Sequence, residues 1–425
     1  MKNKLQSFLL FILLISMISC VKSEKKDHNV LKTKKALTAA DILGDPRYLA
    51  ISYGGYRANS REVQPTIAQL KEDLKLMYAM GIRILRTYNV QLKLPHAANV
   101  LEAISQLKKE DSSFEMYVML GAWIDCLNAW TDKAPDHNVE SAQNEGEIAR
   151  AVALANKYSE IVKVIAVGNE AMVKWATSYY VQPNVILKWV NHLQNLKKEG
   201  KLSKDLWITS SDDFASWGGG EEIYRENEDL PKLIKAVDYV SMHTYAYHNS
   251  HYNPAFWKVP ENEQGLSDIE KVDHAMLRAL DFAKMHYNDV KKYVHTIDST
   301  KTIHIGETGW ATISSGHYGV NGSRATDEYK QGLYFKHLRE WTNKAGISCF
   351  YFEAFDEQWK DAGNPLGSEN HFGLITLQGE AKYPIWNLVD NGTFKGLKRD
   401  GKTITKTFKG DKEALMKTVL VPNID

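Results

Sequence analysis

The sequence has little cysteine and, beyond its first twenty residues, no long apolar run. Only three cysteines occur among 425 residues, too few for a disulfide framework. Cys126 and Cys349 also lack metal-ligand spacing, and we expect both to be small buried hydrophobic residues. No later segment approaches eighteen uninterrupted apolar residues, so no transmembrane helix is predicted there. The sequence also has no basic cluster or nucleic-acid motif, and nucleic acid is therefore not an expected partner.

The overall composition is that of a globular protein with an almost balanced charge. Hydrophobic residues make up 44% and charged residues 25% of the chain, and the net charge is +1. This balance is compatible with an uncharged polymer as partner. The first strand expected in the chain is not followed by a glycine-rich dinucleotide loop, and the histidines are scattered, so we predict neither a cofactor nor a metal.

The N-terminus has the three parts of an export signal. Lys2 and Lys4 give a positive start, residues 8–19 are apolar, and Cys20 follows a small residue. The apolar run is too short to span a bilayer comfortably but fits a signal peptide over residues 1–19. The pattern resembles the lipobox of bacterial lipoproteins, in which Cys20 would be lipidated; ordinary cleavage beside an incidental cysteine is the alternative. Residues 20–40 then read as a flexible tether. We expect an exported protein anchored by lipid to a bacterial membrane, namely the outer membrane, facing the periplasm or the cell surface.

Short apolar runs alternate with amphipathic helical patterns along the rest of the chain. The expected strands are 48–53, 81–87, 116–121, 163–168, 206–210, 238–243, 302–306 and 348–353. The expected helices are 67–80, 97–109, 145–160, 183–199, 268–287 and 325–344, with a weaker one before 238. Alternation of this kind predicts parallel strands joined by helical crossovers. Eight strands favour a (β/α)8 TIM barrel over an open sheet.

We assign the barrel to residues 41–395 and a short C-terminal extension to 396–425. The longest insertions each follow a strand: 122–144, 211–230, 244–267 and 354–380. In a barrel, all of them would lie on the C-terminal face, where enzymes of this fold carry their active sites.

Two glutamates occupy equivalent positions just beyond expected strands. Glu170 follows Gly168-Asn169 after the fourth strand, and Glu307 follows Gly306 after the seventh. A single glutamate at such a place could equally be a capping or ion-paired residue, but two at the same level indicate a carboxylate pair at the barrel mouth. Hydrolysis of a glycosidic bond needs such a pair, one as general acid and one as nucleophile or base.

The sequence around these glutamates resembles glycoside hydrolase family 17. The segments Val167-Gly168-Asn169-Glu170 and Gly306-Glu307-Thr308-Gly309-Trp310 carry the resemblance. Weaker matches at 83–88, 352–357 and 371–374 extend it over about residues 48–390. That family contains β-1,3-glucanases and glucanosyltransferases within the retaining barrel clan. The resemblance implies that Glu170 is the acid/base and Glu307 the nucleophile of a double displacement.

The resemblance also implies supporting roles for residues near the pair. Arg86 would keep Glu307 ionised, Asn169 would bind the sugar 2-hydroxyl, and Tyr245 would orient Glu307. Structural roles are the alternatives: an ion pair at the rim, a turn, or a place in the core. Where the family often has Tyr-Pro-Tyr, this chain has His243-Thr244-Tyr245, which leaves the local geometry open.

Aromatic residues at or after strand ends are candidates for stacking on sugar faces. They are Tyr53, Trp123, Trp217, Trp257, Trp310 and Trp359. Any one of them could be a core residue, but we expect at least two in the cleft. Glu357, after the eighth strand, is expected to position substrate or to support Glu307.

These observations predict a retaining, endo-acting hydrolase of β-1,3-glucan, such as laminarin, that functions as a monomer. The expected partners are the glucan and, through the lipid, a membrane. Transglycosylation, in which a sugar hydroxyl replaces water, uses the same carboxylates and stays open. Exo-action also stays open, because an insertion could block one end of the cleft. A surface lipoprotein that only binds glycan is the non-enzymatic alternative, which would not need a carboxylate pair.

Overall fold

The computed structural model describes residues 37–220 and 222–423, and its centre is a closed barrel of eight parallel strands. The strands in order around the barrel are β1 (Leu49–Ser52), β2 (Ile82–Arg86), β3 (Tyr117–Ala122), β6 (Val162–Asn169), β7 (Trp207–Asp213), β8 (Val240–His243), β9 (Ile303–Gly309) and β10 (Cys349–Phe352), and β10 pairs with β1. Each overlaps one of the eight segments expected to be a strand, although β3, β6, β7 and β9 extend beyond the expected ends, so the prediction of a (β/α)8 barrel is confirmed.

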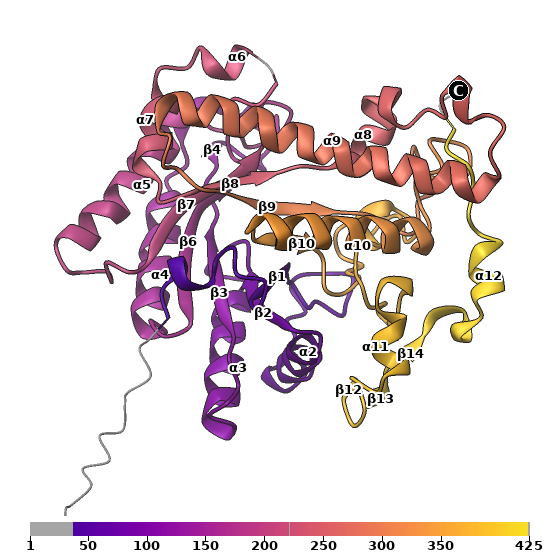
Figure 1. Ribbon diagram of the computed structural model, residues 1–425. Helices are drawn as coiled ribbons and strands as arrows, with labels where there is room; N and C mark the ends of the chain where they lie inside the picture. The colour runs from indigo at the N-terminus through magenta and orange to yellow at the C-terminus, as the bar shows by residue number, and fades with distance from the viewer. Residues whose placement is uncertain (1–36, 221, 424–425) are drawn as a thin grey trace, which may run out of the picture. The chain divides into compact units, whose positions relative to one another are not determined.

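Helices connect the strands and cover the outside of the barrel (Figure 1). They are α2 (Ile67–Ala79), α3 (His96–Glu110), α4 (Asn144–Lys157), α5 (Pro183–Lys198), α6 (Glu222–Arg225), α7 (Asp229–Ala236), α9 (Asp268–Ile297) and α10 (Glu328–Ala345). Helix α9 begins at a capping box of Ser267 and Glu270. It continues past the expected end at residue 287 because Val290 and Val294 extend its buried face.

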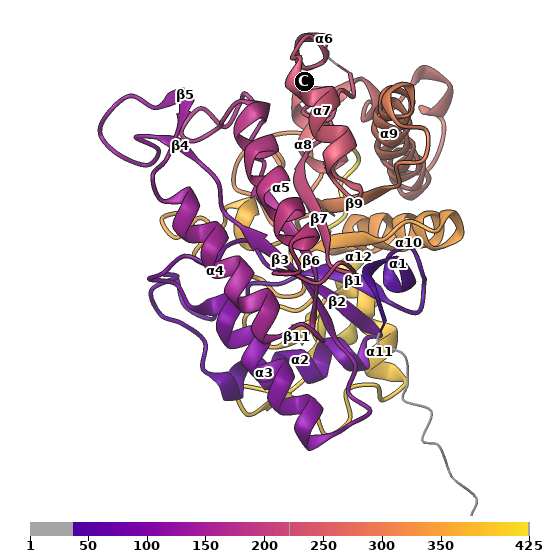
Figure 2. The ribbon, with the colours of Figure 1, turned by 90° about the vertical axis from the view of Figure 1, so that its left-hand side faces the viewer.

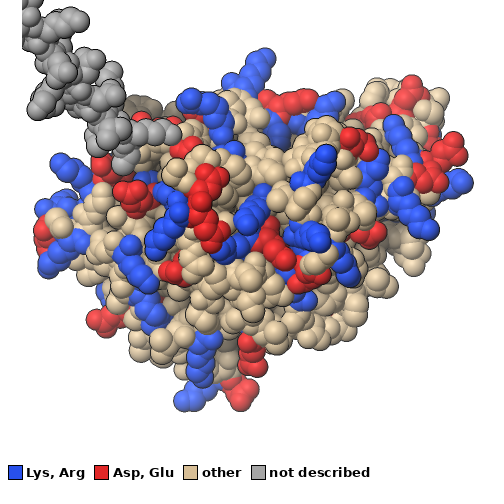
Figure 3. All heavy atoms as spheres, turned by 90° about the horizontal axis from the view of Figure 1, so that it is seen from below, with Lys and Arg blue, Asp and Glu red and all other residues tan. Residues whose placement is uncertain are grey.

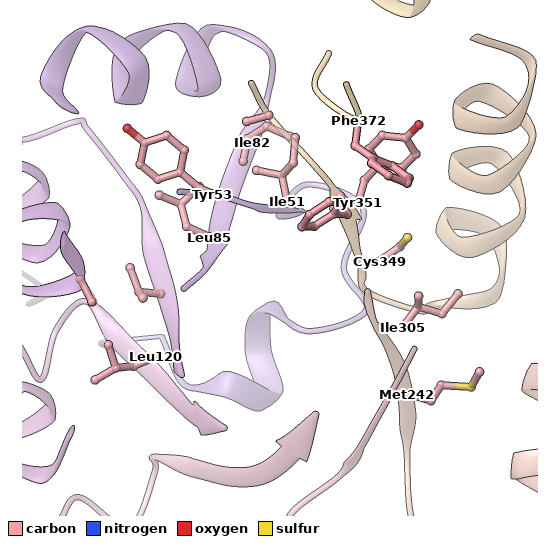
Figure 4. Packing of buried hydrophobic residues seen from close by; sticks show 14 of the residues in the cluster. Ile51, Tyr53, Ile82, Leu85, Leu120, Met242, Ile305, Cys349, Tyr351 and Phe372 are labelled. Atoms are coloured by element: carbon pink, nitrogen blue, oxygen red, sulfur yellow. The ribbon is translucent and has the colours of Figure 1, made fainter. Parts of the chain in front are cut away.

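Side chains along each strand alternate between the inside of the barrel and its outer face, which packs against the helices. The inward residues form one cluster, which includes Ala50, Ile84, Tyr117, Val164, Tyr239 and Phe350. The neighbouring residues on the same strands point outward to the helices, among them Ile51, Leu85 and Tyr351 (Figure 4). The barrel interior is therefore a packed core, and the chemistry has to take place at its mouth.

The short helix α1 (Ala39–Ile42) belongs to the barrel and not to a tether. Ala39 and Ile42 are fully buried in the inward cluster, against residues near the beginnings of the strands. Residues from Leu37 to the C-terminus form one compact unit. The boundary expected at residue 40 therefore lies inside this unit, because the apolar side chains of α1 contribute to the core.

The C-terminal segment also packs against the barrel as part of this unit (Figure 1). Its elements are β11 (Glu380–Ala381), α11 (Trp386–Asp390), β12 (Lys398–Arg399), β13 (Lys402–Thr403), β14 (Thr405–Lys406) and α12 (Lys412–Met416). Strand β14 pairs with β11, and α12 contacts α10. Arg399 is buried and its Nε donates to Asp73 of α2 at 3.0 Å. The boundary expected at residue 395 thus separates two parts of the chain that share buried contacts.

Two insertions after strands carry structure of their own. Strands β4 (Cys126–Leu127) and β5 (Asp136–Glu140) form an antiparallel hairpin after β3. The insertion after β8 forms helix α8 (Ala246–Tyr252) and two 3-10 turns, Pro254–Phe256 and Glu261–Glu263. Figure 2 shows the hairpin projecting from the body beside α5. Both cysteines of the described residues, Cys126 and Cys349, are free and buried as expected.

Residues 1–36 lie outside the described part of the chain, and with them the expected signal peptide, Cys20 and most of the expected tether. Between residues 37 and 423, apart from residue 221, no helix combines the length and the apolar character needed to cross a membrane. On the face drawn in Figure 3, basic and acidic side chains are interspersed.

Candidate active site

Glu170 and Glu307 lie together at the C-terminal mouth of the barrel. Gly168, two residues before Glu170, has a φ of +80°, which favours glycine. At Gly306 a Cβ would lie 2.1 Å from the hydroxyl oxygen of Ser241, so only glycine fits before Glu307. One carboxyl oxygen of Glu170 lies within 4.8 Å of one of Glu307. The two glycines therefore allow two glutamates from distant parts of the chain to face one another.

Glu307 is surrounded by hydrogen-bond donors and is only 7% exposed. Its Oε2 forms an ion pair with the guanidinium of Arg86 and accepts a hydrogen bond from the Tyr88 hydroxyl at 3.0 Å. Its Oε1 accepts from the Tyr245 hydroxyl at 2.7 Å. Burial alone would raise its pKa, but the charge of Arg86 and these donors outweigh burial and lower the pKa of Glu307 to about 2. Glu307 is therefore a carboxylate at neutral pH.

Glu170 has fewer donors, and its backbone is held in the left-handed region with a φ of +47°, which is uncommon for a residue other than glycine. Its Oε1 lies 3.0 Å from Nδ1 of His243. Burial and the negative charge of Glu307 raise the pKa of Glu170 to about 8. Glu170 therefore keeps its proton at neutral pH, while Glu307 does not.

His243 connects the two carboxylates to their surroundings. Its Nε2 lies 2.7 Å from the Ser211 hydroxyl and 3.2 Å from Nη2 of Arg86. Burial lowers the pKa of His243 to about 4, so the ring is neutral. Because the guanidinium of Arg86 can only donate, Nε2 must accept, and the ring proton is placed on Nδ1, facing Glu170.

Arg86 and Asn169 complete the network around the pair. Arg86 is 1% exposed, and its Nη2 donates to Oδ1 of Asn169. Asn169 is partly exposed beside Glu170, where it can also meet substrate. Glu170, His243 and Glu307 could together offer three ligand atoms to a metal ion. The guanidinium of Arg86, however, already supplies a positive charge to this group. The roles expected of Arg86 and Asn169 stay predictions, and their positions are compatible with them.

Two of the expected aromatic residues, Trp123 and Trp359, are partly exposed. Trp123 follows β3 and packs with Tyr179, with ring centroids 5.1 Å apart. Trp359 follows β10, contacts the ring of Tyr56 at 5.7 Å, and has the guanidinium of Arg61 over its own ring. Trp123 and Trp359 are thus the two expected aromatic residues that retain solvent exposure near the mouth.

The remaining aromatic candidates belong to the core, and the expectation that they stack on sugar is corrected. Trp310 is fully buried, and its indole N–H donates to the carbonyl of Ala325. Tyr53 is 1% exposed, and its hydroxyl donates to Asp73. Trp217 and Trp257 are also fully buried, with their indole N–H groups bonded to backbone carbonyls. None of the four presents a ring face to a ligand in solvent.

Glu357 supports loops and does not face the cleft. Its Oε1 accepts from the backbone N–H of Tyr56, and its Oε2 accepts from the indole of Trp359. It is 1% exposed, with Lys360 at 3.5 Å. Glu357 was expected to position substrate or to support Glu307, but its partners are Tyr56, Trp359 and Lys360, and it joins the loops after β1 and β10.

Two residues of the mouth did not stand out in the sequence. Tyr88 donates to Glu307, and its place two residues beyond the end of β2, at the C-terminal face of the barrel, was the available signal. Trp130 lies in the β4–β5 hairpin and is 62% exposed. An isolated tryptophan inside an insertion gives no comparable signal.

The chain is similar to known glycoside hydrolases. A family model described as "BtgE/BtgC glycoside hydrolase domain" matches residues 50–373. A putative glucan endo-1,3-beta-glucosidase btgC of Aspergillus niger is 26% identical over 317 residues, covering 72% of this chain and 37% of that protein. A glucan 1,3-beta-glucosidase of Candida albicans is 32% identical over 232 residues, covering 53% of this chain and 63% of that protein. The chain thus spans less than two thirds of the length of these curated relatives.

Solved structures give the same fold. An endo-laminarinase from Formosa Hel1_33_131 is 62% identical, with a TM-score of 0.90, covering 92% of this chain and 98% of that one. A glycoside hydrolase family 17 β-1,3-glucanosyltransferase from Rhizomucor miehei is 18% identical, with a TM-score of 0.53, covering 80% of this chain and 96% of that one. The second likeness concerns the fold alone.

Proposed function

The chain belongs to the BtgE/BtgC glycoside hydrolase family, and from that premise we propose that it hydrolyses β-1,3-glucan with retention of anomeric configuration. The resemblance to glycoside hydrolase family 17 is confirmed by the same family match and by the 62% identical structure. One observation carries the proposal. Glu170 and Glu307 have carboxyl oxygens within 4.8 Å, one carboxyl protonated and the other ionised.

The separation of the carboxyl groups supports retention over inversion. Inverting enzymes keep their two carboxyl groups roughly 6.5–9.5 Å apart to admit a water, whereas retaining enzymes hold them at about 5–5.5 Å. One carboxyl oxygen of Glu170 lies within 4.8 Å of one of Glu307, an approach that favours the shorter separation of retaining enzymes. Glu307 is then close enough to attack the anomeric carbon directly.

The two steps of the proposed reaction follow from the protonation states. In the first, the Glu307 carboxylate forms a bond to the anomeric carbon, and Glu170 gives its proton to the departing glycosidic oxygen. In the second, the Glu170 carboxylate takes a proton from water, whose oxygen bonds to the anomeric carbon as Glu307 leaves. Glu170 is protonated again at the end, and the site is ready for another cycle.

β-1,3-Glucan and endo-action are supported by the 62% identical protein, which is an endo-laminarinase. The test is digestion of β-1,3-, β-1,4-, β-1,6- and mixed-linkage glucans, with sizing of the products. We expect rapid shortening of β-1,3-glucan to oligosaccharides of several lengths. Release of monosaccharide alone would contradict endo-action, and products longer than the starting oligosaccharide would favour transglycosylation. No turnover of β-1,3-glucan would overturn the proposal.

We further propose that the enzyme is exported and anchored by lipid at Cys20, and that it acts as a monomer. Lys2, Lys4 and the apolar run before Cys20 support the anchor. Labelled fatty acid should be incorporated into the full chain expressed in a bacterium that processes lipoproteins, and Cys20→Ala should abolish it. Equal labelling of both would contradict the assignment. Light scattering of the chain lacking residues 1–19 should give the mass of one copy.

A further inference from the structure

Trp130 is unusually exposed for a tryptophan that is held in place by other rings. Its side chain is 62% exposed, yet its ring stacks on that of Tyr179 with centroids 5.0 Å apart and planes 22° apart. Trp123 completes the group, 5.1 Å from Tyr179 and 6.3 Å from Trp130. We call Trp123, Trp130 and Tyr179 the aromatic platform. Its tyrosine is buried beneath Trp130, so the stacked pair leaves one indole face open to solvent.

Hydrogen bonds hold the turn of the hairpin that carries Trp130. Trp130 itself has a φ of +61°, a backbone conformation that is uncommon for a bulky residue. The turn is closed by the Asn128 side-chain amide, which donates to the carbonyl of Ala134 at 3.1 Å. The Thr131 hydroxyl donates to the carbonyl of Asn128 at 2.8 Å. The exposed ring is therefore held by a built turn.

The β5 end of the hairpin is tied to the barrel. Glu140 accepts a hydrogen bond from the indole N–H of Trp189 of α5 at 2.7 Å. Ser141 donates its backbone N–H to the carbonyl of Asp125 at 3.0 Å. These contacts hold the hairpin beside α5, as Figure 2 shows.

The aromatic platform is continuous with the catalytic mouth. Trp123 directly follows Ala122, which pairs with Val167 three residues before Glu170. The segment after Glu170 returns to the hairpin, because Val181 N–H donates to the carbonyl of Ala171 at 2.7 Å and Cys126 N–H donates to that of Tyr179 at 3.1 Å.

The raised pKa of Tyr179 also indicates that the platform lies near the carboxylate pair. Burial raises the pKa of the Tyr179 hydroxyl, and the charges of Glu170 and Glu307 raise it further. A ligand that occupies the carboxylate pair and extends past β3 would therefore meet Tyr179 and the open face of Trp130.

We propose that the aromatic platform is a glucan-binding subsite away from the cleavage point, at which the open indole face of Trp130 stacks on a glucose ring of a bound chain. This proposal rests on the proposed function. A β-linked glucose ring exposes C–H groups on its faces and hydroxyls at its edge, so a flat indole covers the apolar face while the hydroxyls stay in water. The carboxyl of Asp125 lies beside the platform and interacts with the side chains of Trp123 and Trp130.

The consequence is a dependence of the rate on chain length. A trisaccharide that spans the carboxylates contacts the aromatic platform weakly or not at all, whereas an octasaccharide reaches it. For Trp130→Ala we expect the ratio of kcat/KM on the β-1,3-linked octasaccharide to kcat/KM on the trisaccharide to fall about five- to tenfold, the size of one aromatic stacking contact. Trp130→Phe should restore most of the ratio, because a phenyl ring still offers a flat face.

Trp175 provides a matched control. It is 63% exposed, lies in the segment after Glu170, and makes no ring contact within the part of the chain that the structure describes. Trp175→Ala should leave the ratio at the wild-type value. A comparable fall in both alanine variants would overturn the assignment to the platform, as would an unchanged ratio in Trp130→Ala. Wild-type enzyme inactive on both oligosaccharides would instead refute the proposed function, so the two failures are distinguishable. Circular dichroism of each variant checks that it is folded.

Discussion

The regions around Glu170 and Glu307 differ in one respect that decides their chemistry. Glu170 directly follows β6, Glu307 lies in the last half of β9, and each has a glycine one or two residues before it. Glu307 meets a guanidinium and two tyrosine hydroxyls, whereas Glu170 meets the single N–H of a neutral histidine. Burial and the negative charge of Glu307 raise the pKa of Glu170 to about 8, whereas at Glu307 the charge of Arg86 and the hydrogen-bond donors outweigh burial and lower the pKa to about 2. Equivalent positions in a barrel do not give equivalent acids.

The largest loss of activity is expected when the ionised carboxylate, Glu307, is removed. Glu307→Ala removes the nucleophile, and we expect hydrolysis of β-1,3-glucan to fall by a factor of about 10⁴ or more. Azide fits the vacated space and should restore turnover of an activated aryl glycoside, giving a glycosyl azide of inverted configuration. Turnover close to wild type without azide would contradict the assignment of the nucleophile.

The protonated carboxyl should give a smaller loss that depends on the leaving group. For Glu170→Ala we expect kcat/KM on glucan to fall about 10²- to 10⁴-fold, the range of general acid–base catalysis. An activated aryl glycoside needs little protonation, so its first step should be affected much less. The measurement is the ratio of the two losses under single-turnover conditions. Equal losses on both substrates would argue against the acid role.

The donors around Glu307 can be tested one at a time. Tyr245→Phe removes the hydroxyl that donates to Oε1 at 2.7 Å, and we expect a loss of about 10-fold to 100-fold in kcat, corresponding to ~1.4–2.8 kcal/mol. The acidic limb of the pH profile should move upward, because losing a donor makes the carboxylate less stable. Tyr53→Phe is the matched control, since the Tyr53 hydroxyl donates to Asp73 and not to Glu307. A similar loss in both variants would indicate a general effect on folding.

The smallest predicted effect concerns the single donor to Glu170. Wild-type kcat/KM should fall as pH rises through about 8, because Glu170 then loses the proton that it must give. His243→Ala removes the N–H that stabilises the Glu170 carboxylate, so the pKa of Glu170 should rise and the basic limb should move to higher pH. We expect a loss of about tenfold or less at neutral pH. A basic limb that stays in place would show that His243 does not act on Glu170.

The position of the carboxylate pair was predictable because its signals are local. Gly168-Asn169-Glu170 and Gly306-Glu307 each come at the C-terminal end of an apolar run, although β9 continues to Gly309 and so contains Glu307, and the C-terminal end of a barrel strand lies at the mouth. The network around the pair was only partly predictable. Arg86 and Tyr245 were expected beside Glu307, but contact between His243 and Glu170 joins residues 73 positions apart in the chain. No periodicity in the sequence encodes such a contact.

The aromatic residues show most clearly what the sequence could not predict, namely which rings are buried and which meet solvent. Trp310 and Trp123 both follow strand ends directly, yet Trp310 is fully buried against other rings while Trp123 stays partly exposed. A residue beyond a strand is free of the strand's alternation, so its direction depends on which loops pack over it. Trp130, in the middle of an insertion, stacks on Tyr179 only because the hairpin folds back onto the segment after Glu170.

The sequence by itself determined the order of strands and helices, the barrel, and the two carboxylates at its mouth. Those features depend on hydrophobic periodicity and on position relative to strand ends, both of which are local along the chain. The tertiary structure alone decided which carboxyl is protonated, which aromatic rings meet solvent and how close the pair lies. These depend on burial and on donors from distant segments, such as Arg86 and Glu307, 221 residues apart. Electrostatic energies depend on distance in space, and only the folded chain sets that distance.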